Sequence, residues 1–113
     1  MSETKYSVIM TTCASDEQAA RIATALIEQK LAACVQASHI TSTYRWKGAV
    51  ETEPEVRLSI KARAADYEAI AALIAAMHSY ENPQVLAIPI VAGAPAYLDW
   101  IEAETRRSLQ AGS

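Results

Sequence analysis

The sequence predicts an α+β domain, a ferredoxin-like βαββαβ sandwich with a long protruding β-hairpin and an extra C-terminal helix. Two observations carry this prediction. Segments with strand and helix periodicity follow one another in the order strand, helix, strand, strand, helix, strand, helix. Two consecutive strands are joined by a short turn and are much longer than the others. At 113 residues the whole chain, residues 1–113, is expected to form one such domain.

The N-terminal part of the chain reads as a strand followed by a helix. Residues 6–12 (YSVIMTT) form a short apolar run that suits a central strand. Ser15 and Gln18 have the spacing of a capping box, which predicts the start of a helix. We expect this helix to pack on the sheet, because its apolar residues recur at helical spacing. They are Ala19, Ile22, Ala23, Leu26 and Ile27.

The next segment is predicted to be a hairpin of two unusually long strands. The first strand covers residues 33–46, and Lys47-Gly48 suits a tight turn. The return strand, residues 50–61, alternates between apolar and charged side chains, with Glu51, Glu53 and Glu55 on its polar side. Pro54 lacks a backbone donor, which favours a sheet edge or a bulge at that point.

The last part of the chain supplies a helix, a strand and a terminal helix. The helix is expected over residues 65–78, followed by a loop at residues 79–83 and a strand at residues 84–91. Pro95 fits the first turn of the last helix. The apolar faces of these two helices are Tyr67, Ile70, Leu73, Ile74 and Met77 in the first and Tyr97, Leu98, Trp100 and Ile101 in the second.

The unequal strand lengths predict an assembly. Hairpin strands of about 13 residues extend roughly 43 Å, whereas the other two strands extend roughly 25 Å. Some 15 to 20 Å of two-stranded ribbon should therefore project from the domain, by the same rise per residue. This ribbon carries Ile40, Tyr44 and Trp46, which would be a liability on a monomer. We predict an obligate homo-oligomer, with Trp100 of the last helix at the same interface or at a cleft between subunits.

Composition limits the classes of partner. The net charge is −3 and the basic residues are interspersed with acidic ones, so nucleic acid is not an expected partner. No apolar run approaches the roughly 20 residues that a membrane helix needs. The N-terminal residues lack an apolar signal segment, and we therefore expect a cytoplasmic protein that does not bind membranes. Cys13 and Cys34 are expected to be free thiols.

Five stretches of the sequence resemble the CutA family, named for divalent-cation tolerance. They are KLAACV, STYRWKG, the looser segment from Glu53 to Lys61, HSYENPQVLAIPI and YLDWI. The resemblance implies a ferredoxin-like subunit, a homotrimer built through the hairpin arms, and an architecture similar to that of PII signalling proteins. It also implies an association with copper and other divalent cations. The chain departs from the pattern of some members by having Thr12 at the position of a strand Cys, Ser79 in place of Pro and Gln84 in place of Glu.

Topology brings a candidate set of metal ligands to one end of the sheet. The end of the first strand and the loop before the fourth strand should lie side by side, which places Cys13 near His78 and Glu81. Thiolate, imidazole and carboxylate together suit Cu(II) or Zn(II). Cys34 begins the second strand two strand spacings away and should not share the ion. The alternatives are a helix-capping role for His78 and a solvated loop charge for Glu81.

These features predict a binding protein rather than an enzyme. The chain has no GxGxxG, P-loop, GxSxG or HExxH motif, and it suggests no organic cofactor. The leading hypothesis is a cytoplasmic homotrimer that serves divalent-metal (copper) tolerance and binds metal weakly. The second is a PII-like signalling or scaffold trimer with a small ligand in clefts between subunits, walled by Tyr44 and Trp46. The third is a thiol enzyme with a Cys13–His78 pair, which lacks a visible activating group.

Overall fold

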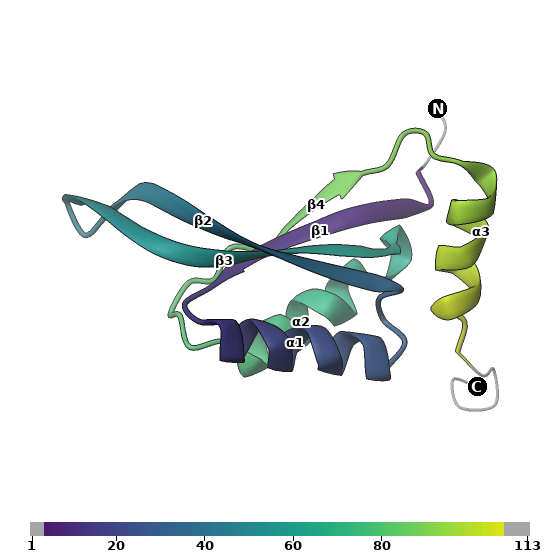
Figure 1. The fold of residues 1–113 in the computed structure, drawn as a ribbon, viewed down its shortest axis with the longest axis horizontal. Coiled ribbons are helices and arrows are strands. Elements are labelled where there is room, and N and C mark those ends of the chain that lie inside the picture. The colour runs from purple at the N-terminus through teal and green to yellow at the C-terminus, as the bar shows by residue number, and fades with distance from the viewer. Residues whose placement is uncertain (1–3, 108–113) are drawn as a thin grey trace.

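The structure is a computed structural model that describes residues 4–107. The parts of the one-domain prediction at residues 1–3 and 108–113 lie outside the described residues. The elements follow the predicted order (Figure 1). They are β1 (Tyr6–Cys13), α1 (Asp16–Glu28), β2 (Cys34–Trp46), β3 (Ala49–Arg63), a 3₁₀ helix (Ala64–Asp66), α2 (Tyr67–Met77), β4 (Leu86–Pro89) and α3 (Pro95–Glu104).

The four strands form one antiparallel sheet in the order β2-β3-β1-β4. α1 and α2 lie together on one face of this sheet, and α3 stands at the end farthest from the hairpin tip (Figure 1). This is the predicted ferredoxin-like arrangement. The core lies between the sheet and the two helices and is made of aliphatic side chains with no exposed surface, namely Ile9, Ile22, Leu26, Ile60, Ile70 and Ile74.

α1 begins and ends as its sequence requires. The Ser15 hydroxyl accepts a hydrogen bond from the Gln18 backbone N–H at 3.1 Å, which confirms the N-cap half of the capping box. After the helix, the Leu31 N–H donates to the Leu26 carbonyl at 2.9 Å in the pattern of a Schellman motif. Lys30 occupies the left-handed position of this motif, with φ of 58°. A side chain is strained there, because glycine is the residue that adopts this conformation freely.

The hairpin is longer than the sheet that carries it. β2 and β3 pair in one continuous register from Cys34 and Lys61 to Trp46 and Ala49. The φ angles of Lys47 and Gly48, 50° and 84°, are both positive, as a two-residue hairpin turn of type I′ requires. β1 pairs with β3 only as far as Val56. Residues 49–55 of β3 therefore extend past β1, and at about 3.4 Å per residue they project roughly 24 Å.

The prediction for Pro54 is confirmed in its edge alternative, whereas the length of β4 and the start of α2 were predicted wrongly. Pro54 causes no bulge, because the β2–β3 register continues through its pairing with Thr41. It lies in the projecting part of β3, which has no β1 neighbour, so it is at a sheet edge as predicted. β4 is four residues long instead of eight, because the chain before it turns towards α2, where the Val85 carbonyl accepts a bond from the Tyr67 hydroxyl at 3.3 Å. α2 begins at Tyr67, after the 3₁₀ helix rather than at residue 65.

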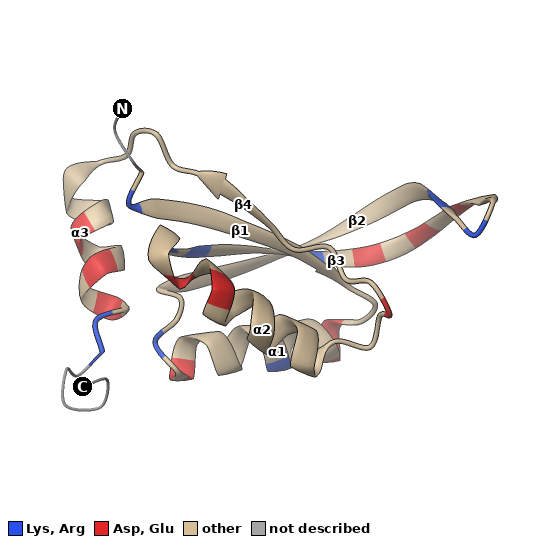
Figure 2. Ribbon diagram, turned by 180° about the vertical axis from the view of Figure 1, so that it is seen from behind, with Lys and Arg blue, Asp and Glu red and all other residues tan. Residues whose placement is uncertain are grey.

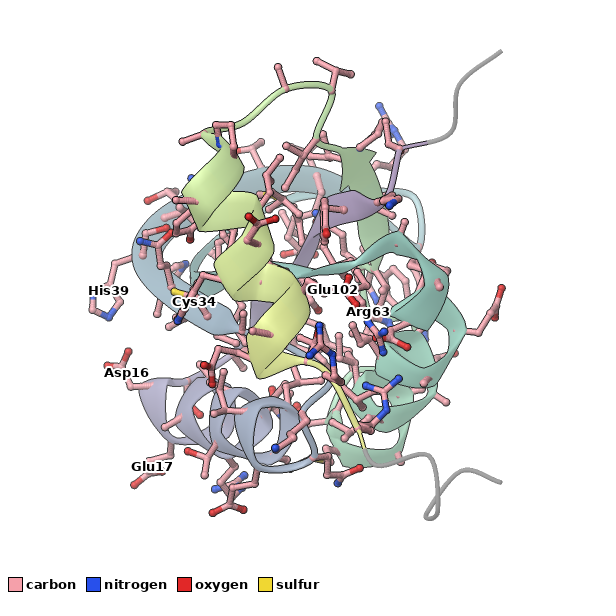
Figure 3. All side chains as sticks on the ribbon, turned by 90° about the vertical axis from the view of Figure 1, so that its right-hand side faces the viewer. Asp16, Glu17, Cys34, His39, Arg63 and Glu102 are labelled. Atoms are coloured by element: carbon pink, nitrogen blue, oxygen red, sulfur yellow. The ribbon has the colours of Figure 1, made fainter. Side chains whose placement is uncertain are left out.

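α3 is held against the end of the sheet by charged side chains. The side chain of Asp66 is only 9% exposed. Its carboxylate accepts hydrogen bonds from Nη2 of Arg107 at 2.7 Å and from Nε of Arg63 at 3.2 Å. Arg63 also lies 3.7 Å from Glu102 of α3, and the two are side by side in Figure 3. Glu102 in turn accepts a bond from the Tyr6 hydroxyl at 3.3 Å. No helix in residues 4–107 is long and apolar enough to cross a membrane.

Candidate functional site: the arm and the 78–84 loop

The projecting part of the hairpin, residues 40–55, is called the arm below. Val56, Leu58 and Ile60 of β3 point under the helices and are buried, so the odd-numbered residues of β3 lie on the opposite, open face. The register puts the even-numbered residues of β2 on that same open face. The open face of the arm therefore carries Ile40, Tyr44, Trp46, Glu51, Glu53 and Glu55. Figure 2 shows these acidic positions as a series of red segments along β3, with basic residues at the turn.

The predicted interface residues fall into two groups. Tyr44 and Trp46 are each 39% exposed on the arm, and Ile40 is half-buried near its root. Trp100 is 40% exposed, but it lies on α3, at the other end of the molecule. Its ring packs beside that of Tyr97, with 5.5 Å between the ring centroids. The arm residues share one surface, and Trp100 belongs to another.

The open face also bears an apolar strip that the sequence analysis missed. Met10 pairs with Leu86 and Val8 pairs with Ile88, and their parity places all four on the face without helices. Leu86 is 53% exposed and Ile88 is 48% exposed. The signal was present in the sequence, because apolar side chains occupy both parities of β1, which indicates a strand with two apolar faces.

An open cleft of about 770 Å³ lies between the arm and the loop that connects α2 to β4. The arm contributes Tyr44, Trp46 and Glu55, and the loop contributes Tyr80, Glu81 and Asn82. Hydroxyl and amide groups make up much of the remaining lining, and Arg45 is the basic residue among the lining residues. The volume falls in the range of small-molecule sites in proteins.

His78 fixes the start of this loop through both of its ring nitrogens. Nε2 lies 2.7 Å from the Thr12 carbonyl of β1, and Nδ1 accepts the Tyr80 backbone N–H at 3.0 Å. Because a carbonyl only accepts, Nε2 must carry the hydrogen in this arrangement. The helix-capping alternative predicted that His78 would contact free carbonyls at the end of its own helix. The carbonyl that it contacts belongs instead to Thr12 of β1, so this alternative was wrong.

Tyr80 continues the same chain of hydrogen bonds to the arm. Its hydroxyl donates to Oε2 of Glu55 at 2.6 Å. Burial, and then the hydrogen bond to Glu55, raise the pKa of the Tyr80 phenol well above its usual value. Desolvation, and then Glu53, raise the pKa of Tyr44. Desolvation is the largest cause of both shifts, and the carboxylates of Glu53 and Glu55 add to it.

The three expected metal ligands do not form a cluster in the part of the chain that the structure describes. Cys13 has no exposed surface, and burial followed by the charge of Glu55 raises the pKa of its thiol. His78 uses both ring nitrogens, and Glu81 is exposed on the loop. Within residues 4–107, no three His, Cys, Asp or Glu side chains are grouped so that they could hold a metal ion. The copper ligands therefore stay a prediction.

The remaining cysteine and histidine lie elsewhere. Cys34 and Cys13 are both free thiols, as expected. His39 is exposed, and its Nε2 lies 2.8 Å from the Asp16 carboxylate at the start of α1 (Figure 3). Sequence periodicity could not reveal this pair, because the two residues are 23 positions apart.

Comparison with known proteins gives consistent relatives. A relative from Xenopus laevis, Protein CutA homolog, is 43% identical over 96 residues, which are 84% of this chain and 64% of that protein. The Divalent-cation tolerance protein CutA of Archaeoglobus fulgidus is 40% identical over 97 residues, which are 86% of this chain and 95% of that protein. The chain thus spans less than two thirds of the length of the Xenopus relative and of a mouse relative, of which it covers 61%.

Solved structures share the fold at similar identity. The structure of the periplasmic divalent cation tolerance protein CutA from Archaeoglobus fulgidus has a TM-score of 0.88 at 39% identity, covering 89% of this chain and 99% of that one. CutA1 from Shewanella sp. SIB1 has a TM-score of 0.87 at 42% identity, covering 91% and 97%. The CutA1 divalent ion tolerance protein family matches residues 7–104. This chain therefore belongs to the CutA1 divalent ion tolerance protein family.

Proposed function

We propose that this chain is a cytoplasmic homotrimeric divalent-cation tolerance protein that assembles through its arm and binds divalent metal, copper included, weakly. The observation that carries the proposal is the arm, which projects roughly 24 Å beyond β1 and exposes Tyr44 and Trp46. An isolated two-stranded ribbon is marginal in water. A neighbouring subunit would cover Trp46 near the tip of the arm and the open edges of the ribbon.

The arrangement of edges favours a closed ring of subunits. The arm presents the open edge of β3, and the far side of the sheet presents β4, which pairs only with β1 among the described strands. Pairing an arm with a different surface of the next copy is a head-to-tail contact, which closes into a ring when the rotation between copies allows it. The trimer that we propose is a ring of three such contacts. The apolar strip of Val8, Met10, Leu86 and Ile88 would line the inside of the assembly.

The metal part of the proposal draws on family membership and on the loop. The Archaeoglobus fulgidus and Thermus thermophilus relatives are both named divalent-cation tolerance proteins. The proposed ligands are Cys13, His78 and Glu81, which are not grouped among residues 4–107 and would have to come together when the metal binds. Binding would have to displace the bonds that His78 makes to Thr12 and Tyr80, and would have to deprotonate a buried thiol. Both rearrangements cost free energy, so weak affinity is expected.

The same observations favour binding over catalysis. A nucleophilic thiol acts as the thiolate, and burial of Cys13 keeps its pKa high. His78 is committed to Thr12 and Tyr80 and makes no hydrogen bond to Cys13.

Two measurements on tag-free protein test the proposal. Light scattering should give a mass close to three times the 12.2 kDa subunit, and a monodisperse monomer would overturn the assembly. Copper titration calorimetry should show weak binding that falls at least about tenfold in His78→Ala. His39→Ala removes the other histidine and serves as the matched control. Equal affinity of wild type and His78→Ala would remove His78 from the metal site while leaving the trimer intact.

The second hypothesis, a PII-like signalling or scaffold trimer with a small ligand between subunits, is favoured by the cleft of about 770 Å³ beside the arm. A thermal-shift screen of metals, nucleotides, amines and anions separates the two hypotheses, since a specific ligand raises the melting temperature by mass action. A response to divalent metals alone would support tolerance, and a response to an organic ligand alone would support signalling.

A further inference from the structure

The root of the arm combines a carboxylate with aromatic walls inside the cleft. Glu55 has one oxygen, Oε2, held by the Tyr80 hydroxyl at 2.6 Å. Its other oxygen, Oε1, has no hydrogen-bond partner among residues 4–107, and Glu55 lines the cleft. Tyr44 of the arm and Tyr80 of the loop also line the cleft. The cleft thus offers a carboxylate oxygen and two phenol rings among its lining residues.

The charges around this cleft favour a cation. Glu81 lines it from the loop, and Glu53 and Glu51 continue the open face of the arm beyond Glu55. Arg45 lines the cleft as well, and the Lys47 amine lies 5.5 Å from the centre of the Trp46 ring at the far end of the arm. Carboxylates therefore outnumber basic groups here, and an anion would be repelled.

The donors suit an organic cation better than a metal ion. A metal ion needs three or four ligands converging on one point, and no such group exists in residues 4–107. An alkylammonium group needs less: one carboxylate, and aromatic faces within about 6 Å. Both phenols are uncharged at neutral pH, since the ordinary pKa of 10.0 is raised further for Tyr44 and Tyr80, and their rings can serve as uncharged walls.

We propose that the cleft between the arm and the 79–84 loop binds a small organic ammonium compound, with Glu55 as the counter-ion and Tyr44 and Tyr80 as the aromatic walls. Glu81 adds long-range attraction from the loop. This site shares Glu81 with the metal ligands proposed above, whereas Cys13 and His78 do not line the cleft, so Glu55, Tyr44 and Tyr80 distinguish it from the metal site. Because Tyr80 joins the loop to Glu55 on the arm, an occupant would also fix the position of the arm relative to the loop.

The test compares choline with 3,3-dimethyl-1-butanol, a neutral molecule of the same shape. Backbone amide shifts of the full-length protein are followed by NMR as each compound is added. Choline should shift the amides of residues 79–84 and Tyr44 saturably, and the neutral compound should bind at least about tenfold more weakly. Equal binding of the two compounds, or no saturable shift with choline at high millimolar concentration, would overturn the proposal.

Variants that each remove one carboxylate test whether choline affinity depends on the charge of the cleft or on the net charge of the protein. Glu55→Gln should lower the affinity for choline at least about tenfold, whereas Glu28→Gln, which removes the same charge from the exposed end of α1, should leave it unchanged. Glu81→Gln alters an exposed loop residue and should lower the affinity by a smaller factor, which keeps the test open if Glu55→Gln does not fold. Unchanged affinity in Glu81→Gln and in a folded Glu55→Gln would refute the assignment. Light scattering and copper titration on the same samples report on the proposed function separately.

Discussion

Trp46 offers the sharpest test of the assembly, because it is an apolar side chain left uncovered at the end of the arm. It is 39% exposed in the single subunit. A tryptophan side chain has up to about 250 Å² of surface, so roughly 100 Å² of Trp46 remains for a neighbour to cover. At about 25 cal/mol per Å², covering this area stabilises the assembly by roughly 2.5 kcal/mol per subunit. Replacing Trp46 by alanine should remove most of that.

The effect is multiplied by the number of subunits. Three copies together lose roughly 7 kcal/mol, which raises the equilibrium constant for dissociation of a trimer into monomers by about 10⁵. The subunit concentration at half-dissociation varies as the square root of this constant, so it should rise by roughly 300-fold. Analytical ultracentrifugation over a wide range of concentrations, with urea added equally to all samples if the wild type does not dissociate, measures that midpoint.

A matched control uses another partly exposed apolar side chain. Ile27 is 42% exposed on α1, on the side of the subunit covered by helices. Ile27→Ala should leave the dissociation midpoint where it is. If Trp46→Ala shifts the midpoint no more than Ile27→Ala does, the arm is not the assembling element and the reasoning from strand length fails.

Three further predictions concern the stability of the fold. Lys30→Gly relieves a left-handed backbone position and should raise the free energy of unfolding by about 0.5–1 kcal/mol in urea titrations, whereas Gln29→Gly, at the preceding right-handed position, should lower it. Arg107→Ala leaves the nearly buried Asp66 carboxylate with one partner fewer and should cost about 1–2 kcal/mol by the same assay; an equal loss in Arg106→Ala, an exposed neighbour, would contradict this account. The pKa of Tyr80 is higher in the folded protein than its usual value of 10.0, so its contribution to stability is complete below pH 10 and is lost as the pH rises further. Melting temperatures of wild type should therefore fall more steeply above that pH than those of Tyr80→Phe, and parallel curves would refute the assignment.

Local patterns were enough to place most of the elements. The capping residue Ser15, the helical spacing of Ile22 and Leu26, and the Lys47-Gly48 turn each act within a few residues, and the structure confirms all three. Strand length was also readable from the long runs on either side of the Lys47-Gly48 turn, and β2 and β3 pair in one continuous register. The sequence failed on β4, where the hydroxyl of Tyr67 binds the Val85 carbonyl and draws the chain out of the sheet. That contact joins residues 18 positions apart, beyond the reach of any local pattern.

The candidate site divides in the same way. Tyr44, Trp46 and Ile40 were identified from the sequence, because they lie on the part of the hairpin that is longer than the rest of the sheet. The cleft was not, since it depends on a loop and an arm that are far apart in the chain and meet only in the fold. Glu55 was assigned to a solvated face, and the structure shows that it accepts the hydrogen of Tyr80.

By itself, the sequence determined the order of elements, the overhanging arm and the family, since each depends on short-range periodicity or on motifs that can be read directly. Tertiary structure decided the protonation and the hydrogen-bond partners of the reactive side chains. Burial set the pKa of Cys13, and contacts from β1 and the loop occupied both nitrogens of His78. Protonation and hydrogen bonding depend on which groups surround a side chain in three dimensions, and that environment exists only once the chain has folded.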